Sequence, residues 1–201
     1  MTDQGFLVLA DISGFTAFVT STELEHGAEV TGLLLEAVMR ELAPPLEIQE
    51  VEGDAVFAIG ADGTTPADDV SPVLARAFAA FKEQQAEIGR DESCSCGACR
   101  RVPNLNLKLI VHHGRFVRQT VGGRSRVAGV DVILVHQLLK NQVGADAYLL
   151  FTAKALERAG LDPTAGRMRP YLGTYPHLGE VEFFVADLET ASRVPEATQA
   201  A

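Results

Sequence analysis

The order of apolar and polar residues predicts a strand followed by two helices at the start of the chain. Residues 6–10 are all apolar and rich in strand formers, which is typical of a buried strand. Apolar residues at helical spacing then predict a short helix that Gly27 breaks. A second amphipathic helix is predicted over 30–42, and Pro44 and Pro45 end it because proline cannot continue a helix.

The next segment alternates in the manner of a hairpin. Residues 46–52 alternate apolar and polar, residues 55–59 are apolar, and Gly53 and Asp54 stand between them. This pattern predicts two antiparallel strands joined by a tight turn. A loop is then expected before a long helix over 70–88, which carries its apolar residues on one face.

The second half of the chain repeats this alternation of strands and helices. We expect a second hairpin formed by 105–113 and 115–121, with Gly114 at its turn. The remaining predicted elements are a helix over 129–141, a strand over 147–151, a helix over 152–159 and one or two strands within 169–188.

This order of elements indicates an α+β fold. It predicts a ferredoxin-like sandwich in which helices pack on one face of a mostly antiparallel sheet. No internal repeat or long linker divides the chain, so we expect one domain over 1–188 with a cysteine-bearing loop at 91–104. Residues 189–201 are Ala-rich and polar and are expected to form a frayed tail.

Composition narrows the class of protein. The formal net charge of −10 argues against a nucleic-acid-binding protein, which would be basic. No apolar run reaches the ~20 residues of a membrane span, and no basic region precedes the first apolar stretch as in a secretory signal. We therefore expect a cytoplasmic protein that binds neither nucleic acid nor membrane.

The charge is unevenly distributed along the chain. Residues 1–90 hold 16 acidic side chains against 4 Lys and Arg, whereas residues 91–126 hold 2 against 7. Two interpretations remain open: two differently solvated faces, or a set of cations that faces an anionic ligand or the acidic half of a partner subunit. The cations concerned include Arg115, Arg118, Arg124 and Arg126.

Two acidic residues stand where the pattern predicts the ends of strands. Asp11 follows the apolar run of 6–10 and precedes Gly14, and Asp54 follows Gly53 in the predicted hairpin. Such placement can bring two carboxylates together for a divalent cation and a phosphate. The alternative is that Asp11 caps a helix and Asp54 only forms a turn.

With these acids in place, the chain resembles the class III adenylate/guanylate cyclases over residues 5–150. The segment 6–16 is similar to their Asp-Ile-x-Gly-Phe-Thr strand motif, and 50–58 to their Gly-Asp hairpin motif. The resemblance implies the nucleotide-cyclase fold, a homodimer and a purine nucleotide ligand. It also implies that Asp11, Asp54 and the backbone carbonyl of Ile12 hold two divalent cations, Mg²⁺ or Mn²⁺.

The same resemblance suggests nucleotide contacts. Backbone N–H groups at the start of a helix can receive phosphate oxygens, here those of Ser13, Gly14, Phe15 and Thr16. Glu50 takes the position at which guanylate cyclases carry the Glu that accepts hydrogen bonds from guanine. Arg126 takes the position of the second base-reading residue, and a cation there matches neither the adenylate nor the guanylate cyclase pairing. The alternative for Glu50 is an exposed hairpin acid.

The predicted helix over 129–141 departs from the cyclase pattern. Ile133 stands where the resemblance implies an Asn that orients the ribose, and Gln137 where it implies an Arg that stabilises the transition state. Losing such an Arg typically costs ~10³-fold or more in phosphoryl transfer. We therefore expect a degenerate cyclase homologue with a regulatory or interaction role. The alternative is an active, guanylate-cyclase-like enzyme.

Three cysteines lie in one short segment, at Cys94, Cys96 and Cys99. An odd number in one cluster is a poor disulfide framework. The thiols could supply most of a tetrahedral Zn²⁺ site, with a fourth ligand from His112, His113 or elsewhere. Reduced loop thiols and redox chemistry are the alternatives, so a zinc- or redox-responsive protein is a third hypothesis.

Overall fold

Eight strands form one sheet in the computed structural model, which describes residues 2–90, 94 and 96–188. The strands are β1 (Thr2–Ser13), β2 (Glu47–Glu52), β3 (Ala55–Ala61), β4 (Asn106–Val121), β5 (Arg124–Ala128), β6 (Tyr148–Thr152), β7 (Arg169–Tyr175) and β8 (Gly179–Asp187). Their order across the sheet is β2-β3-β1-β4-β6-β8-β7, with β5 paired to the far end of β4. Only β4 and β6 pair in parallel, so the predicted α+β class is confirmed.

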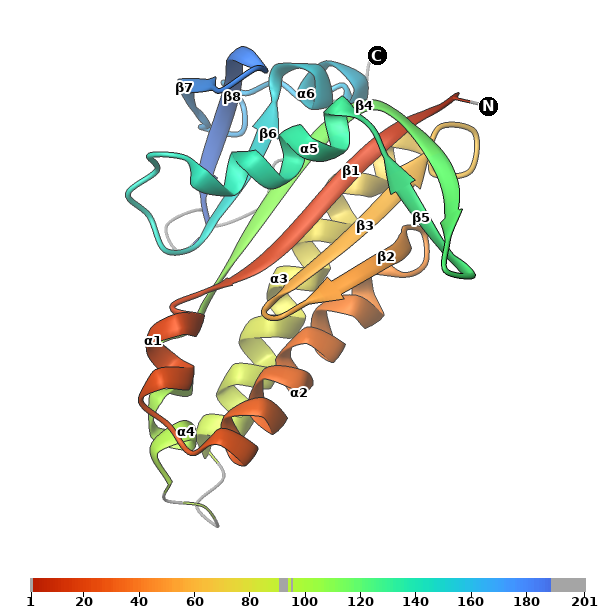
Figure 1. Ribbon diagram of the computed structural model, residues 1–201. Coiled ribbons are helices and arrows are strands. Elements are labelled where there is room, and N and C mark those ends of the chain that lie inside the picture. Colours follow the sequence, from red (N-terminus) through yellow and green to blue (C-terminus); the bar gives the residue numbers. More distant parts are fainter. Residues whose placement is uncertain (1, 91–93, 95, 189–201) are drawn as a thin grey trace.

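Helices cover both faces of the sheet unequally (Figure 1). Most of the helical mass packs on one face, which agrees with the prediction, and the single helix α5 (Val130–Gln137) packs on the other. The first group comprises α1 (Phe15–Thr20), α2 (Leu24–Leu42), α3 (Ala67–Arg90), α4 (Gly97–Arg101) and α6 (Ala153–Ala159). Among the described helices, none is long and apolar enough to cross a membrane.

The apolar run in β1 serves both faces, which explains why it does not alternate. Phe6, Val8 and Ala10 belong to the core under α2 and α3. Leu7 and Leu9 belong to the core under α5. Successive residues of a strand point to opposite faces, so Asp11 is the next residue on the α5 face. Asp11 therefore lies on the sheet face that, among the described residues, is covered by the single helix α5.

Two predicted elements are wrong in detail. Gly27 does not break a helix, because α2 begins at Leu24 and the Gly27 N–H donates to the Glu23 carbonyl at 2.8 Å. A Cβ on Gly27 would lie 2.9 Å from the Thr22 hydroxyl, so the glycine serves a close approach between chain segments. The interruption between α1 and α2 falls at residues 21–23 instead.

The predicted hairpin over 105–121 is also wrong, because β4 runs through Gly114 without a turn. Gly114 is buried against the Asp131 side chain, which a Cβ at this position would meet at 2.4 Å. The chain turns later, at Gly122 and Gly123, where β4 and β5 form a projecting two-stranded arm. A glycine that allows close packing was therefore mistaken for a glycine that allows a turn.

Other elements follow the prediction with adjusted ends. The hairpin of β2 and β3 is confirmed, with a bulge between Ile48 and Glu50. The helix predicted over 129–141 is α5 followed by a 3-10 turn at residues 138–140. The loop predicted over 91–104 contains α4 and a 3-10 turn at 102–104, and the predicted tail lies outside the described residues.

Candidate functional site

A row of polar residues crosses the centre of the sheet on the α5 face. Asp11 in β1 lies directly opposite Lys108 in β4, and Lys108 lies opposite Tyr148 in β6. Directly paired residues point to the same face of a sheet, so these three side chains are neighbours. The Lys108 ammonium lies 6.0 Å from the centre of the Tyr148 ring.

Asp54 joins this row from the turn between β2 and β3. The Ile12 N–H donates to the Asp54 carbonyl at 3.1 Å, which fixes the turn against the end of β1. The Ile12 side chain is buried under the helices, while its carbonyl remains a predicted metal ligand. The structure thus brings together the two acidic segments that are 43 residues apart in the chain.

Burial and charge at the two carboxyl groups make their ionised forms unfavourable, and Lys108 compensates this only in part. Burial raises the pKa of Asp11 to about 6, and the charge of Asp54 adds to this shift. Burial also raises the pKa of Asp54. Lys108 lowers both pKa values but does not cancel the shifts. Such a pair favours whatever supplies further positive charge, including a divalent cation.

Lys108 was missed by the sequence analysis. It is half-buried in the middle of a strand whose other residues are mostly buried and apolar. The alternation of β4 alone marks it as a residue that faces outward. Only the pairing of β4 with β1 shows that it faces Asp11.

Two tyrosines line the far side of this row. The Tyr148 hydroxyl accepts a hydrogen bond of 2.6 Å from the side-chain amide of Asn141, and burial raises the pKa of Tyr148. The nearby Tyr175 hydroxyl is buried and has no hydrogen-bond partner among the residues that the structure describes. An unpaired buried hydroxyl is unfavourable, so a water molecule or a polar ligand atom would be stabilised there.

The segment predicted to receive phosphate follows Asp11 directly. Ser13 ends β1 and is buried, and Phe15 and Thr16 begin α1. Gly14 has a φ of 85°, a left-handed conformation that glycine adopts without strain, and its carbonyl accepts from the Phe18 N–H at 3.0 Å. The four residues therefore lie beside the carboxylates, at the start of a helix of six residues.

The two residues that are predicted to contact the nucleotide base interact with each other instead. Glu50 in β2 and Arg126 in β5 form an ion pair, and both side chains are exposed. Glu50 is paired with Phe57 of β3 and so lies on the same face as Asp11. The acidic and basic residues of this region therefore neutralise each other partly within one chain.

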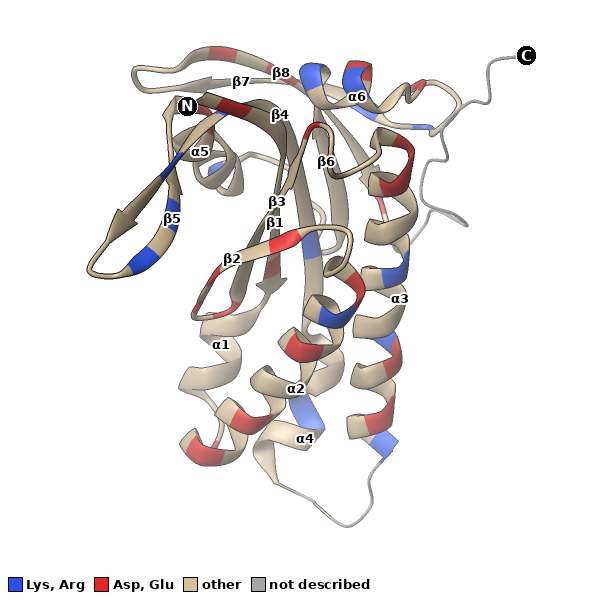
Figure 2. Cartoon of the chain, turned by 90° about the vertical axis from the view of Figure 1, so that its right-hand side faces the viewer, with Lys and Arg blue, Asp and Glu red and all other residues tan. Residues whose placement is uncertain are grey.

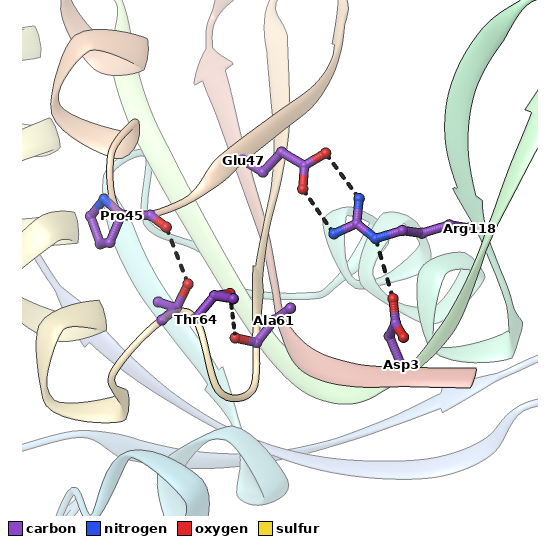
Figure 3. A network of polar contacts seen from close by, with 7 residues as sticks. Asp3, Pro45, Glu47, Ala61, Thr64 and Arg118 are labelled. Atoms are coloured by element: carbon purple, nitrogen blue, oxygen red, sulfur yellow. Dashed lines mark hydrogen bonds and ion pairs between the residues drawn. The ribbon is translucent and has the colours of Figure 1, made fainter. Parts of the chain in front are cut away.

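Arg118 makes a second link between the arm and the sheet (Figure 3). Its guanidinium donates two hydrogen bonds to the Glu47 carboxylate, at 2.9 and 2.8 Å, and one to Asp3 at 3.2 Å. Figure 2 shows basic residues on β5 beside the acidic edge formed by β2. Arg118 and Arg126 thus have acidic partners in their own chain, which explains part of the uneven charge distribution.

Helix α5 presents the two residues at which the cyclase pattern is interrupted. Ile133 is 55% exposed, and Gln137 is half-buried one turn later. Between them, His136 packs edge-on against Phe57, with ring centres 5.0 Å apart. Its Nδ1 donates to the Val132 carbonyl at 2.8 Å, because a carbonyl can only accept.

The three cysteines converge on a histidine that the sequence analysis did not select. His26 of α2 lies 3.6 Å from Cys94 and 3.0 Å from Cys96 through Nδ1, and 3.8 Å from Cys99 through Nε2. The N–H of Cys99 donates to the Cys96 sulfur, and this bond is the main cause of a lowered Cys96 pKa, about 7. Burial raises the pKa of Cys99 to about 12.

The two histidines suggested as zinc ligands lie elsewhere. His112 is buried between the Thr152 hydroxyl, at 2.9 Å from Nδ1, and Asp131, at 3.0 Å from Nε2. His113 points to the other face and pairs with Asp62 at 3.1 Å. Both are engaged in ion pairs or hydrogen bonds far along β4 from the cysteines.

A large open cleft of about 910 Å³ lies at the opposite end of β1 from Asp11. Its lining includes Gln4, Arg115, Asp131, Lys154 and Arg158. Because neither Asp11 nor Asp54 lines it, this cleft is not the site that the acidic residues form. We therefore locate the candidate site at the Asp11 and Asp54 carboxylates and not in this cleft.

Comparison with known proteins identifies the family to which this chain belongs. Residues 31–148 match the family model described as "Protein of unknown function (DUF2652)". A protein of Mycobacterium tuberculosis, "Uncharacterized protein Rv2561/Rv2562", is 33% identical over 165 residues, which cover 81% of this chain and 75% of that protein.

Solved structures with the same fold include nucleotide cyclases and a cyclase-like ATP-binding protein. The guanylyl cyclase Cya2 superposes with a TM-score of 0.70 at 15% identity, covering 98% of both chains. A class III adenylyl cyclase-like ATP-binding protein from Pseudomonas aeruginosa superposes with a TM-score of 0.61 at 16% identity, covering 78% of this chain and 35% of that one. The chain has the class III nucleotidyl cyclase fold, and it belongs to the DUF2652 family.

Proposed function

We propose that this protein binds a purine nucleotide together with a divalent cation at the Asp11–Asp54 end of the sheet, and that it has lost efficient cyclase turnover. The observation that carries the proposal is the convergence of Asp11 and Asp54 on the sheet face that α5 covers, a helix that carries Ile133 and Gln137 in place of the cyclase residues. The binding half of a cyclase site is retained in this arrangement, while the groups for transition-state stabilisation are replaced. Such a protein would act in a regulatory or interaction role.

The cation expected at this site is Mg²⁺ or Mn²⁺. The Asp11 and Asp54 carboxylates and the Ile12 carbonyl would hold it, since these hard cations prefer oxygen ligands. The raised pKa values of both carboxyl groups support this assignment, because burial of both groups, and for Asp11 also the charge of Asp54, disfavour negative charge without a counterion. When bound, the cation would neutralise charge on the phosphates of the nucleotide.

Lys108 reduces the number of cations that the site would take. Two carboxylates and one ammonium carry a net charge of −1, whereas the cyclase resemblance implies two divalent cations at the two carboxylates. We therefore expect one divalent cation per site, with Lys108 in place of the second positive charge.

Glu50 supports guanine as the base. A carboxylate can accept hydrogen bonds from both the N1–H and the amino group of guanine, whereas adenine offers no matching pair of donors. The Glu50 carboxylate already forms an ion pair with Arg126 in this chain. The base would therefore have to displace this exposed ion pair. Exposed ion pairs are weak, typically ~0.2–1 kcal/mol, so the displacement is feasible.

Loss of turnover follows from the chemistry of α5. Ile133 has no polar group to hydrogen-bond a ribose, and Gln137 has no charge to stabilise a developing negative charge on phosphate. Lys140, the only Lys or Arg within residues 129–141, is exposed in the 3-10 turn after α5. The ATP-binding protein of the same fold supports a binding role without implying the cyclase reaction.

A homodimer is part of the proposal. The resemblance implies a site shared between two subunits, and one chain leaves the Glu50, Arg126 and Ile133 side chains exposed. Light scattering after gel filtration would test this state. A monomer at every concentration measured would reject the dimer without affecting nucleotide binding by one chain.

Calorimetry with GTP and ATP, each with Mn²⁺ or Mg²⁺, tests the binding site. We expect binding of at least one nucleotide, loss of that binding in Asp11→Ala, and no change in Asp146→Ala, an exposed acid in the loop before β6. Binding of neither nucleotide by the wild type would reject the proposal. A preference for ATP would reject the role given to Glu50.

A product assay tests the loss of turnover separately. The wild type is expected to form little or no cyclic nucleotide under conditions in which it binds the triphosphate. Formation of cyclic GMP at the rate of an ordinary cyclase, abolished in Asp54→Ala, would establish the alternative of an active guanylate-cyclase-like enzyme.

A further inference from the structure

His26, Cys94, Cys96 and Cys99 have the arrangement of a metal site. One ligand atom from each residue lies within 4.8 Å of the others. In a tetrahedral zinc site with Zn–S of about 2.3 Å and Zn–N of about 2.0 Å, a sulfur and a nitrogen ligand are roughly 3.5 Å apart. The His26 Nδ1 distances of 3.0 and 3.6 Å to Cys96 and Cys94 agree with that separation.

The surrounding hydrogen bonds fix the ligands in place. The Glu23 carboxylate accepts from the N–H groups of Gly97 and Ala98, at 3.1 and 3.2 Å, and so holds the first turn of α4 against the start of α2. Cys96 is the N-cap residue of α4, and its sulfur accepts from the Cys99 N–H at 3.3 Å. Partners of this kind orient the ligands of a metal and stabilise thiolates.

A disulfide explains the cluster less well. All three cysteines are free thiols in the structure, and any one pair would leave the third thiol and His26 without a role. The histidine comes from a helix that is 68 residues away from Cys94 in the chain, and its imidazole lies among all three sulfurs. Three sulfur ligands and one imidazole form a donor set that zinc prefers.

We propose that His26, Cys94, Cys96 and Cys99 bind one Zn²⁺ in a closed tetrahedral site that joins α2 to α4. Four protein ligands leave no open coordination position, so the ion is structural and does not take part in a reaction. Figure 1 shows α4 beside the start of α2, at the end of the helical layer that lies away from most of the sheet. The site does not rest on the proposed nucleotide binding.

The position of the site explains what the ion would stabilise. Helix α1 connects Asp11 at the end of β1 to the start of α2, and α4 precedes β4 with Lys108. The ion would therefore tie together two of the chain segments that lead to the carboxylate row. Because unfolded chains do not preserve such a site, its binding free energy adds to the stability of the fold.

Metal analysis of the whole protein, purified without a chelator and without a histidine tag, tests the proposal. We expect about one zinc per chain, retained in His136→Ala, and less than about 0.2 in Cys96→Ser and His26→Ala. His136 is the matched control because it is also a half-buried helical histidine. Chelation should lower the melting temperature of the wild type.

A second measurement removes the dependence on variants that fail to fold. Wild-type protein, stripped under reducing conditions and titrated with Co²⁺, should give the intense visible bands of tetrahedral cobalt and a thiolate-to-cobalt charge-transfer band. Saturation at about one Co²⁺ per chain, reversed by Zn²⁺, is expected. Failure of the wild type to bind either ion above about 0.2 equivalents would overturn the proposal.

Discussion

Asp11 and Lys108 lie directly opposite each other in the antiparallel pair of β1 and β4. The sheet therefore builds a cation into the row that holds the two acidic residues. Lys108 lowers the pKa of both Asp11 and Asp54, yet both remain above their ordinary values because burial outweighs it. The site is partly neutralised in advance, and this sets how strongly it attracts a further cation.

Replacing Lys108 by Met should strengthen the binding of a divalent cation. The substitution removes a positive charge beside the carboxylates and keeps the length of the side chain. We expect affinity for Mn²⁺ to rise about tenfold near pH 8, or ~1.4 kcal/mol, as measured by electron paramagnetic resonance. Lys154→Met, at an exposed position in the distant cleft, is the matched control and should change nothing. Unchanged affinity in Lys108→Met would show that Lys108 does not interact with the bound ion.

Replacing Asp11 by Asn should stabilise the protein above pH 6 in the absence of divalent cations. The pKa of Asp11 is about 6 in the folded protein, against an ordinary value of 3.8, so the folded state holds the proton more tightly. Its contribution to stability is therefore full below about pH 4 and is lost as the pH rises through 6. The full shift would correspond to about 3 kcal/mol, and solvent screening at this partly exposed group reduces the expected gain to the order of 1 kcal/mol.

Urea unfolding at several pH values, with a chelator for divalent ions present, measures this effect. The free energy of unfolding of the wild type should fall relative to Asp11→Asn between pH 4 and 6 and then stay lower. Asp146→Asn removes an exposed carboxylate and should leave the pH profile unchanged. A wild-type profile parallel to that of Asp11→Asn would contradict the raised pKa.

The acidic pair could be predicted from the sequence because each residue follows a clear local pattern. A wholly apolar run ended by Asp11, and a Gly-Asp turn between two alternating segments, determine where each carboxylate lies along its own strand. The resemblance to cyclases added that these strand ends are adjacent, and the structure agrees.

Lys108 and His26 could not be predicted because their partners are distant in the chain. Lys108 reads as an ordinary outward residue until β4 is known to pair with β1. His26 reads as a surface residue of a helix until α4 is known to lie against the start of α2. In both cases the chemistry depends on non-local packing, which periodicity does not encode.

Arg118 and Glu47 should be energetically coupled because they form a bidentate pair between the arm and β2. We expect a double-mutant cycle with Arg118→Met and Glu47→Gln to give about 0.5–1 kcal/mol at low salt, falling at high salt. The pair of Arg76 and Glu41 has a single contact of 3.2 Å and should give less coupling. Equal coupling in the two pairs would show that the bidentate geometry adds nothing to the attachment of the arm.

Gly114→Ala should destabilise the protein by about 2–4 kcal/mol, because the new Cβ would meet the Asp131 side chain at 2.4–2.6 Å. Asp131 cannot easily move, since it accepts from the Arg115 N–H at 2.8 Å and holds the buried His112 at 3.0 Å. Gly32→Ala in α2 is the matched control: a Cβ there meets nothing within 4 Å, so a gain of about 0.5–1 kcal/mol is expected from helix propensity. Urea unfolding of both variants measures the difference. A mild effect of Gly114→Ala would mean that β4 turns at this glycine, as its sequence suggests, and does not run through it against α5.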